Sequence, residues 1–199
     1  MNIVCLDMEG VITPEIWIAF AEAAGIPALR RTTRDEPDYD RLMHYRMDIL
    51  REHGLGLADI QRVIAGIDPL PGAGAFLDSL RELTQVIILS DTFEEFAMPL
   101  LAKLGRPVIF CNSLETDEDG MISGYRMRTV PSKLNTVRAL QSVGFTPICC
   151  GDSYNDLDMI RAGKAGFLFR TTQTIKDENP EIKAFDEYDE LLEAIKAAL

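Results

Sequence analysis

The 199-residue sequence is short of several features, and each shortage excludes a class of protein. Its four cysteines and two histidines give neither a disulfide framework nor the spacing of a zinc site. No apolar run reaches the length of a membrane-spanning helix, and no basic region precedes the first apolar residues. Basic residues number 20 against 32 acidic ones, and the net charge of −12 argues against nucleic acid or an anionic membrane as a partner. We therefore expect an ordinary globular protein of a reducing compartment, the cytoplasm.

Short apolar runs alternate with amphipathic segments through most of the chain. This alternation predicts an α/β fold with a doubly wound parallel sheet. Residues 13–68 interrupt the pattern with helical segments only, so we expect a small helical cap inserted after the first strand, and a core made of residues 1–12 and 69–199. The predicted strands are residues 3–6, 85–89, 107–111, 146–150 and 166–169, with a hairpin over 114–126.

Capping signals mark the starts of three predicted helices. Thr13, followed by Pro14, predicts the N-cap of the first helix. Thr92 with Glu95 and Ser153 with Asp156 have the spacing of capping boxes. The polar stretch 27–37, broken by two prolines, predicts a loop or an irregular turn between the first two cap helices.

Two carboxylates, Asp7 and Glu9, follow the first strand directly. Ionised carboxylates at the end of a buried strand are costly unless a positive group compensates them. In open α/β sheets, ligands bind at the carboxyl ends of the strands. The pair is thus either the start of a catalytic site or a solvated strand end, and the two residues alone do not decide between these interpretations.

Further polar residues follow other predicted strands. Carboxylates suit Mg²⁺, and a hydroxyl, backbone N–H groups and a lysine suit a phosphate. Asp7 is a candidate nucleophile towards phosphorus and Glu9 a candidate acid/base. Each residue alone also has a structural explanation, as a helix cap, a turn residue or a surface charge. The candidates are Asp7, Asp152 and Asp156 for the metal, and Ser90 and Lys133 for the phosphate.

Taken together, these motifs resemble the haloacid dehalogenase superfamily of phosphatases, in that family's order. The matching segments are Asp7-Met-Glu9-Gly-Val, Leu89-Ser90-Asp91-Thr92, Lys133 and Gly151-Asp152-Ser-Tyr-Asn155-Asp156.

The helical insertion resembles the phosphoserine phosphatase branch. This resemblance implies that Glu15 binds the ammonium group of the substrate, that Tyr39 occupies an aromatic position and that Arg46 binds the carboxylate. It also implies that Glu9 contributes its backbone carbonyl to the metal site, and that Asp91, Thr92 and Asn155 lie beside the substrate.

The chain departs from most of this branch at two places. Glu9 stands where aspartate is usual, and Asp91 with Thr92 stand where two glycines are usual. These variations are similar to a narrower group, the bifunctional phosphoserine phosphatases that also transfer phosphate to homoserine. The resemblance implies a Mg²⁺-dependent phosphomonoesterase acting on phosphoserine through an aspartyl-phosphate.

Several alternatives remain open at this stage. The site also suits another small phosphate ester, a non-enzymatic phospho-receiver module or a catalytically silent interaction protein. The apolar face around Trp17 fits either the core or the surface of a homodimer.

Overall fold

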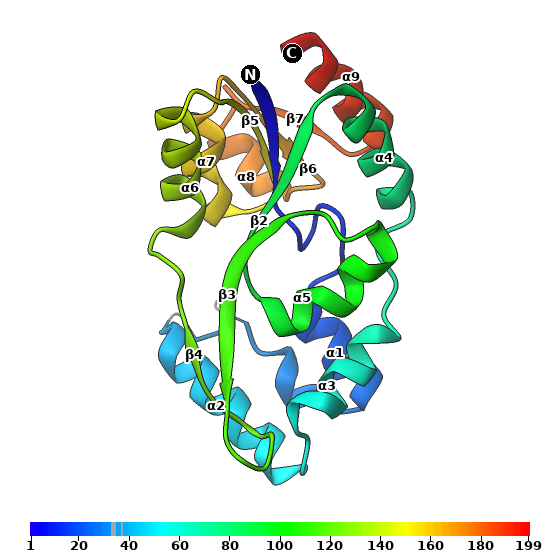
Figure 1. The fold of residues 1–199 in the computed structure, drawn as a ribbon, viewed down its shortest axis with the longest axis vertical. Helices are drawn as coiled ribbons and strands as arrows, with labels where there is room; N and C mark the ends of the chain where they lie inside the picture. The colour runs from blue at the N-terminus through cyan, green and yellow to red at the C-terminus, as the bar shows by residue number, and fades with distance from the viewer. Residues whose placement is uncertain (33–34, 37) are drawn as a thin grey trace.

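The computed structural model describes residues 1–32, 35–36 and 38–199. Within these residues, a sheet of seven strands has the order β4-β3-β2-β1-β5-β6-β7 (Figure 1). Neighbouring strands run parallel, except that β3 and β4 are antiparallel. The expected α/β fold with a mostly parallel sheet is confirmed. The strands are β1 (Asn2–Leu6), β2 (Gln85–Phe93), β3 (Ile109–Thr116), β4 (Ile122–Arg126), β5 (Thr146–Gly151), β6 (Ala165–Phe169) and β7 (Lys183–Phe185).

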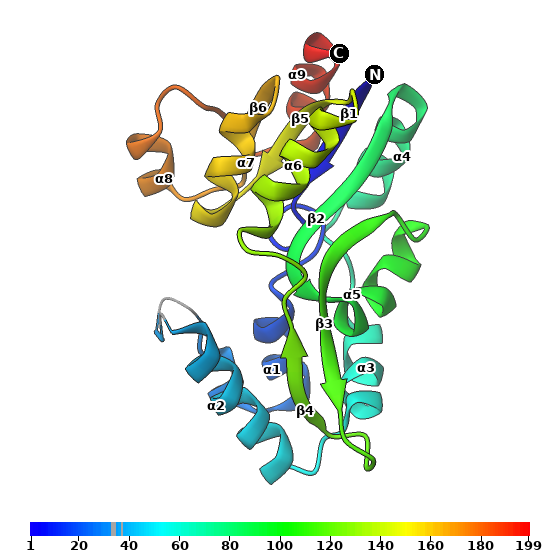
Figure 2. The same cartoon turned by 60° about the vertical axis from the view of Figure 1, so that its left-hand side comes forward.

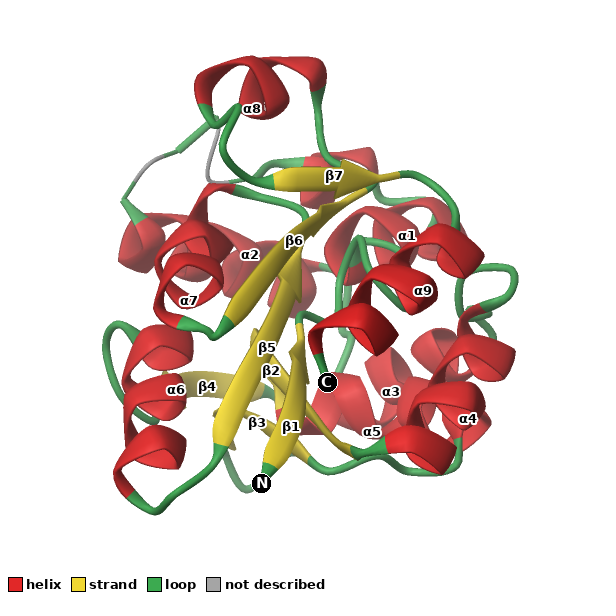
Figure 3. Cartoon of the chain, turned by 90° about the horizontal axis from the view of Figure 1, so that it is seen from above, coloured by secondary structure: helices red, strands yellow, loops and turns green. Residues whose placement is uncertain are grey.

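Helices cover both faces of the sheet, as Figure 3 shows from above. The side chains of β1 alternate between two hydrophobic clusters, with Val4 and Leu6 in one and Ile3 and Cys5 in the other. The first cluster packs against α4 (Ala73–Leu83) and α9 (Tyr188–Ala198), and the second against α6 (Ser132–Ser142), α7 (Leu157–Ala162) and α8 (Gln173–Glu178). Burial on both faces explains the continuous apolar run of β1.

The segment after β1 folds into helices beyond the carboxyl ends of the strands (Figure 1). These are α1 (Ile16–Ala24), the 3₁₀ helix η1 (Pro27–Arg30), α2 (Tyr39–Glu52) and α3 (Leu57–Ala65). A loop or an irregular turn was expected over residues 27–37, and the first part of this stretch forms η1. Residues 33, 34 and 37 lie outside the described part of the chain. The division into core and cap stays a prediction.

The β3–β4 hairpin extends from the sheet alongside these helices, as Figure 2 shows. The backbone N–H of Leu57 donates to the Gly120 carbonyl at 2.9 Å, near the hairpin turn. Farther along, the Tyr125 hydroxyl donates to Asp40 Oδ1 at 2.8 Å. The hairpin therefore connects the sheet to both α2 and α3.

Two of the three capping predictions are wrong, and the third is confirmed. Thr13 is buried and its hydroxyl donates to the Met8 carbonyl, while α1 begins three residues later with Glu15 as N-cap residue. Thr92 lies inside β2, because pairing with β3 continues to Phe93, and α5 (Glu94–Leu101) begins after it. Ser153 and Asp156 do form a capping box, which opens the 3₁₀ helix η3 (Tyr154–Asp156).

The 3₁₀ helix η2 (Ala102–Leu104) extends α5. Across the described residues, every helix is too short or too polar to pass through a lipid bilayer.

Candidate active site

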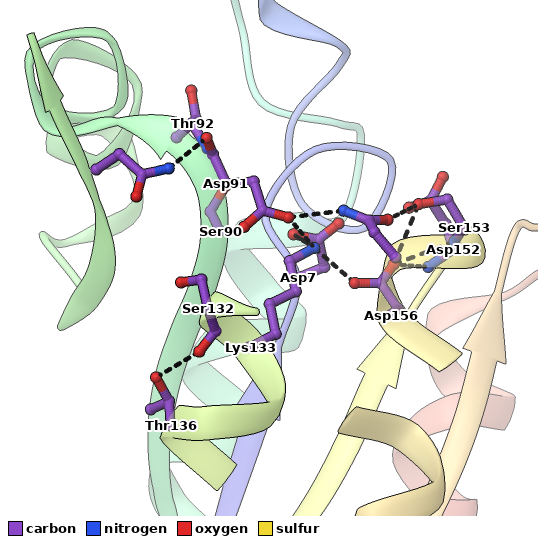
Figure 4. A network of polar contacts seen from close by, with 12 residues as sticks. Asp7, Ser90, Asp91, Thr92, Ser132, Lys133, Thr136, Asp152, Ser153 and Asp156 are labelled. Carbon is purple, nitrogen blue, oxygen red and sulfur yellow. Dashed lines mark hydrogen bonds and ion pairs between the residues drawn. The ribbon is translucent and has the colours of Figure 1, made fainter. Parts of the chain in front are cut away.

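The structure brings the strand-end residues of the core into one polar network (Figure 4). Asp7 directly follows β1, and Lys133 is the second residue of α6. The Lys133 ammonium lies 2.9 Å from Asp7 Oδ1 and 2.6 Å from Asp156 Oδ1. Parallel strands end at the same edge of a sheet, so residues more than a hundred positions apart meet here. The lysine side chain is only 3% exposed, which makes it part of a buried site and not a surface charge.

Three carboxylates share this network. One oxygen from each of Asp7, Asp152 and Asp156 lies within 4.8 Å of the others. A Cβ atom at Gly10 would lie 2.5 Å from the Asp152 carboxyl carbon, and one at Gly151 would lie 2.3 Å from that of Asp156. Only glycine leaves room for this close approach. The cluster offers the hard oxygen ligands that Mg²⁺ prefers, so the residues present fit such an ion.

The electrostatics of the cluster favour an added cation. Burial and the neighbouring Asp156 raise the pKa of Asp7 well above its usual range, although Lys133 opposes the shift. Burial and Asp156 also raise the pKa of Asp152 to about 7. Burial alone would lower the pKa of Lys133, but the attraction of Asp7 and Asp156 outweighs it and raises that pKa. One ammonium therefore does not fully compensate two buried carboxylates and the partly buried carboxylate of Asp152.

Asp156 is bonded through both of its carboxylate oxygens. Oδ1 contacts Lys133, and Oδ2 accepts the backbone N–H groups of Asp152 at 3.0 Å and Ser153 at 3.1 Å. The residue is fully buried. These bonds orient the lysine and fix the loop that carries Asp152.

Asp91 faces the same lysine from the end of β2. Its Oδ2 accepts a hydrogen bond from the Asn155 side-chain amide at 2.8 Å and lies 3.9 Å from the Lys133 ammonium. Asn112 of β3 holds β2 in place, because its side-chain amide donates to the Asp91 carbonyl at 2.8 Å.

Ser90, the residue before Asp91, is 2% exposed, and its hydroxyl accepts the Thr92 backbone N–H at 3.2 Å. A hydroxyl, an ammonium and a carboxylate thus meet beside Asp7.

Glu9 connects the core to the inserted helices. Its Oε2 accepts the backbone N–H of Ile16, the first residue of α1, at 2.9 Å. Burial and the nearby Glu15 raise the pKa of Glu9 to about 8, while hydrogen bonds from Ile16 and Thr92 act in the opposite direction. A carboxyl group with this pKa can both give and accept a proton near neutral pH.

Arg46 points inward from α2 although it is charged. It is 5% exposed, and its guanidinium lies 4.4 Å from the centre of the Trp17 ring. Nη2 donates to the Arg31 carbonyl at 2.7 Å, and Nε has no hydrogen-bond partner within the described part of the chain. Burial lowers the pKa of Arg46 to about 10, while Tyr39, Glu9 and Glu15 oppose that shift. A buried cation with an unused donor suits an anionic group of a ligand.

The predicted site residues therefore fall into two neighbouring groups. Tyr39 connects them, since the charges of Arg46, Asp91 and Glu9 all act on its hydroxyl, whose pKa burial raises. The roles of these residues stay predictions. The core group contains Asp7, Ser90, Asp91, Lys133, Asp152, Asn155 and Asp156, and the group near the inserted helices contains Glu9, Glu15, Tyr39, Arg46 and Thr92.

Sequence reasoning missed two residues that shape the site. Tyr125 of the hairpin packs edge-to-face against Tyr39, with ring centres 5.6 Å apart, and against Phe93 at 6.0 Å. Asn112 bridges β2 and the segment before α6, because its Oδ1 also accepts the Arg128 backbone N–H at 3.0 Å. Both residues contact partners that are distant in the sequence, so the local sequence pattern did not indicate that they lie at the site.

Comparison with known proteins gives a consistent set of relatives. A family model described as haloacid dehalogenase-like hydrolase matches residues 1–164. The chain is 51% identical over 191 residues to the Pseudomonas aeruginosa protein named phosphoserine phosphatase ThrH, covering 96% of this chain and 93% of that protein. It is also 51% identical over 199 residues to a phosphoserine phosphatase of Pseudomonas syringae pv. tomato, covering 100% and 84% of the two chains. Among solved structures, a phospho-aspartyl intermediate analogue of phosphoserine phosphatase superimposes with a TM-score of 0.74 at 17% identity, covering 96% of this chain and 97% of that one.

Proposed function

The chain belongs to the haloacid dehalogenase-like hydrolases, and from this premise we propose that it is a Mg²⁺-dependent phosphoserine phosphatase. The observation that carries the proposal is the site itself: a buried carboxylate, Asp7, bonded to a buried lysine beside two further acids. The names of the two curated relatives support phosphoserine as substrate. We further propose that the phosphoryl group can pass to homoserine as well as to water.

The phosphate end of the substrate would be held at the core. Lys133 supplies a charge next to Asp7, and the Ser90 hydroxyl and backbone N–H groups at the end of β2 supply neutral donors. The amino-acid end would lie towards the inserted helices. There the Arg46 guanidinium pairs with the substrate carboxylate, and the Glu15 carboxylate with its ammonium. Such a pair selects a zwitterion over a neutral ester.

Asp7 and Asp152 would hold the Mg²⁺ ion, together with the backbone carbonyl of Glu9. Asp156 would complete the acidic set while holding Lys133, to which it is already bonded. When bound, the ion supplies positive charge that offsets the clustered carboxylates and the phosphate oxygens.

The reaction would proceed in two steps at Asp7. A carboxylate oxygen of Asp7 forms a bond to phosphorus while the bond from phosphorus to the serine oxygen breaks. Glu9 gives its proton to that leaving oxygen, and serine departs as a neutral alcohol. Glu9 then takes a proton from water, or from the homoserine hydroxyl, as that oxygen attacks phosphorus and releases Asp7. The products are inorganic phosphate or phosphohomoserine.

Phosphorus NMR of the purified protein with phosphoserine and Mg²⁺, with and without excess homoserine, tests this proposal. We expect inorganic phosphate in the first sample and an additional phosphohomoserine signal in the second. Inorganic phosphate alone in both samples would reject the transfer reaction and retain the phosphatase. An unchanged phosphoserine signal in both would reject the substrate.

A further inference from the structure

The carboxylate of Glu9 is attached to the first residue of the inserted helices. Its Oε2 accepts the backbone N–H of Ile16 at 2.9 Å, seven residues along the chain. The first N–H groups of a helix have no acceptor within the helix. Glu15, the N-cap residue of α1, makes no side-chain capping bond. Glu9 therefore satisfies a helix terminus that the local sequence leaves open.

The segment between these two residues is held by its own hydrogen bonds. The backbone N–H of Gly10 donates to the Thr13 carbonyl at 2.8 Å, and that of Thr13 donates to the Met8 carbonyl at 3.0 Å. From the far side, the buried hydroxyl of Tyr188 donates to the Val11 carbonyl at 2.6 Å. The Ile16 N–H is thus presented to Glu9 from a fixed loop.

The bond also depends on the length of the Glu9 side chain. An aspartate is one methylene shorter, about 1.5 Å along the chain. From the same backbone position its oxygen would lie beyond hydrogen-bond distance of the Ile16 N–H. Glutamate in place of aspartate at position 9 therefore allows the side chain to reach the first N–H group of α1.

We propose that Ile16 is a positioning residue, whose backbone N–H holds the Glu9 carboxylate where it exchanges a proton with the substrate oxygen. This inference rests on the proposed function, in which Glu9 is the acid/base. The donor belongs to α1, so the acid/base group is in place only when that helix lies at the carboxyl edge of the sheet.

Ile16→Pro removes the donor while preserving the backbone. Proline is well tolerated at the first position of a helix, where its missing N–H breaks no helical bond. The preceding Glu15 has φ −57° and ψ 112°, the extended conformation that a residue before proline requires. Ile16 is 1% exposed, so the substitution also removes packing. Ile16→Val keeps the N–H and serves as the matched control for lost volume.

The readout is the single-turnover rate at which Asp7 is phosphorylated by two substrates whose leaving groups differ, because the second step needs Glu9 whichever substrate supplied the phosphoryl group. The serine oxygen needs a proton as it leaves, whereas acetyl phosphate releases acetate without one. We expect Ile16→Pro to lower this rate for phosphoserine at least about tenfold relative to Ile16→Val, within the range of general acid catalysis. On acetyl phosphate, the two variants should agree within about twofold.

Equal losses on both substrates would mark a structural defect and overturn the inference, as would identical behaviour of the two variants. A second measurement uses the Glu9→Gln background, where Ile16→Pro should cause no additional loss on phosphoserine. A full additive loss there would also overturn the inference. A wild type that consumes acetyl phosphate but not phosphoserine would contradict the proposed function, so the two failures are distinguishable.

Discussion

The ammonium group of Lys133 lies 2.9 Å from Oδ1 of Asp7, and both side chains are almost completely buried. A buried ion pair of this kind stabilises the protein only while both partners are present, because either charge alone is costly to bury. The same contact would place a positive charge beside the phosphoryl group. In the proposed reaction, stability and catalysis would therefore depend on the same two residues.

Lys133→Met should destabilise the metal-free protein by about 3 kcal/mol, since it leaves buried carboxylates unpaired. The matched control is Lys103→Met, because the Lys103 ammonium pairs with exposed Asp68 at 2.8 Å and such surface pairs contribute about 1 kcal/mol or less. Urea unfolding of both variants measures the difference. Equal destabilisation would contradict the burial argument.

Asp152→Asn should change how stability depends on pH in the absence of metal. Burial, followed by the nearby Asp156, raises the pKa of Asp152 from 3.8 to about 7. Between these values the folded protein binds more protons than the unfolded chain, so wild-type stability falls as pH rises through this window. Over the same pH range, the free energy of unfolding of the variant should fall by about 1–2 kcal/mol less than that of the wild type.

Thermal unfolding with chelator across this pH range tests the predicted pH dependence, and the same measurement with Mg²⁺ tests whether Asp152 binds the metal. Mg²⁺ should raise the wild-type Tm and leave the Asp152→Asn variant nearly unchanged. Asp158→Asn, at an exposed position of α7, is the control and should respond as the wild type does. An Asp152→Asn variant with a wild-type response to Mg²⁺ would remove Asp152 from the metal site.

Arg46→Met should discriminate between two substrates that differ only in a carboxylate. Loss of a charge-assisted pair costs about 2–3 kcal/mol, so KM for phosphoserine should rise about 30- to 150-fold. Phosphoethanolamine keeps the ammonium and the phosphate but has no carboxylate, and its KM should change much less. Steady-state assays of both substrates measure the ratio. Equal losses would show that Arg46 does not select the substrate carboxylate.

Asp91→Asn should strengthen inhibition by inorganic phosphate. The Asp91 carboxylate lies 3.9 Å from the Lys133 ammonium and would therefore compete with a phosphate for the same cation. Asparagine keeps the shape and removes the negative charge. The inhibition constant should fall about threefold to tenfold, the effect of roughly 1 kcal/mol of repulsion. An unchanged or higher constant would mean that Asp91 does not face the bound phosphate.

The fold was predictable where burial dominates the sequence pattern. β1 and β5 are apolar runs buried on both faces, and both appear as expected. β7 was missed because a three-residue edge strand that begins with Lys183 has no alternating pattern. α8 was missed because Ile175 is its one buried residue, so it has no apolar face to recognise.

The positions of some site residues were also predictable, because they directly follow buried strands. Asp7 and Asp152 follow buried strands, and parallel topology brings such positions together. The end of β2 was misread, because Thr92 and Glu95 have the spacing of a helix cap while tertiary pairing with β3 keeps Thr92 in the strand. The anchoring of Glu9 to Ile16 requires a loop geometry that no local pattern encodes.

The proposed reaction requires that Asp7 carries the phosphoryl group during turnover. An aspartyl-phosphate is an acyl phosphate, which borohydride reduces to homoserine within the chain. The enzyme would be mixed with excess phosphoserine and Mg²⁺, denatured rapidly, reduced and mapped by mass spectrometry. We predict that position 7 is converted in the wild type and in no sample without substrate. Release of phosphate with position 7 unmodified, or conversion at another carboxylate, would contradict the claim.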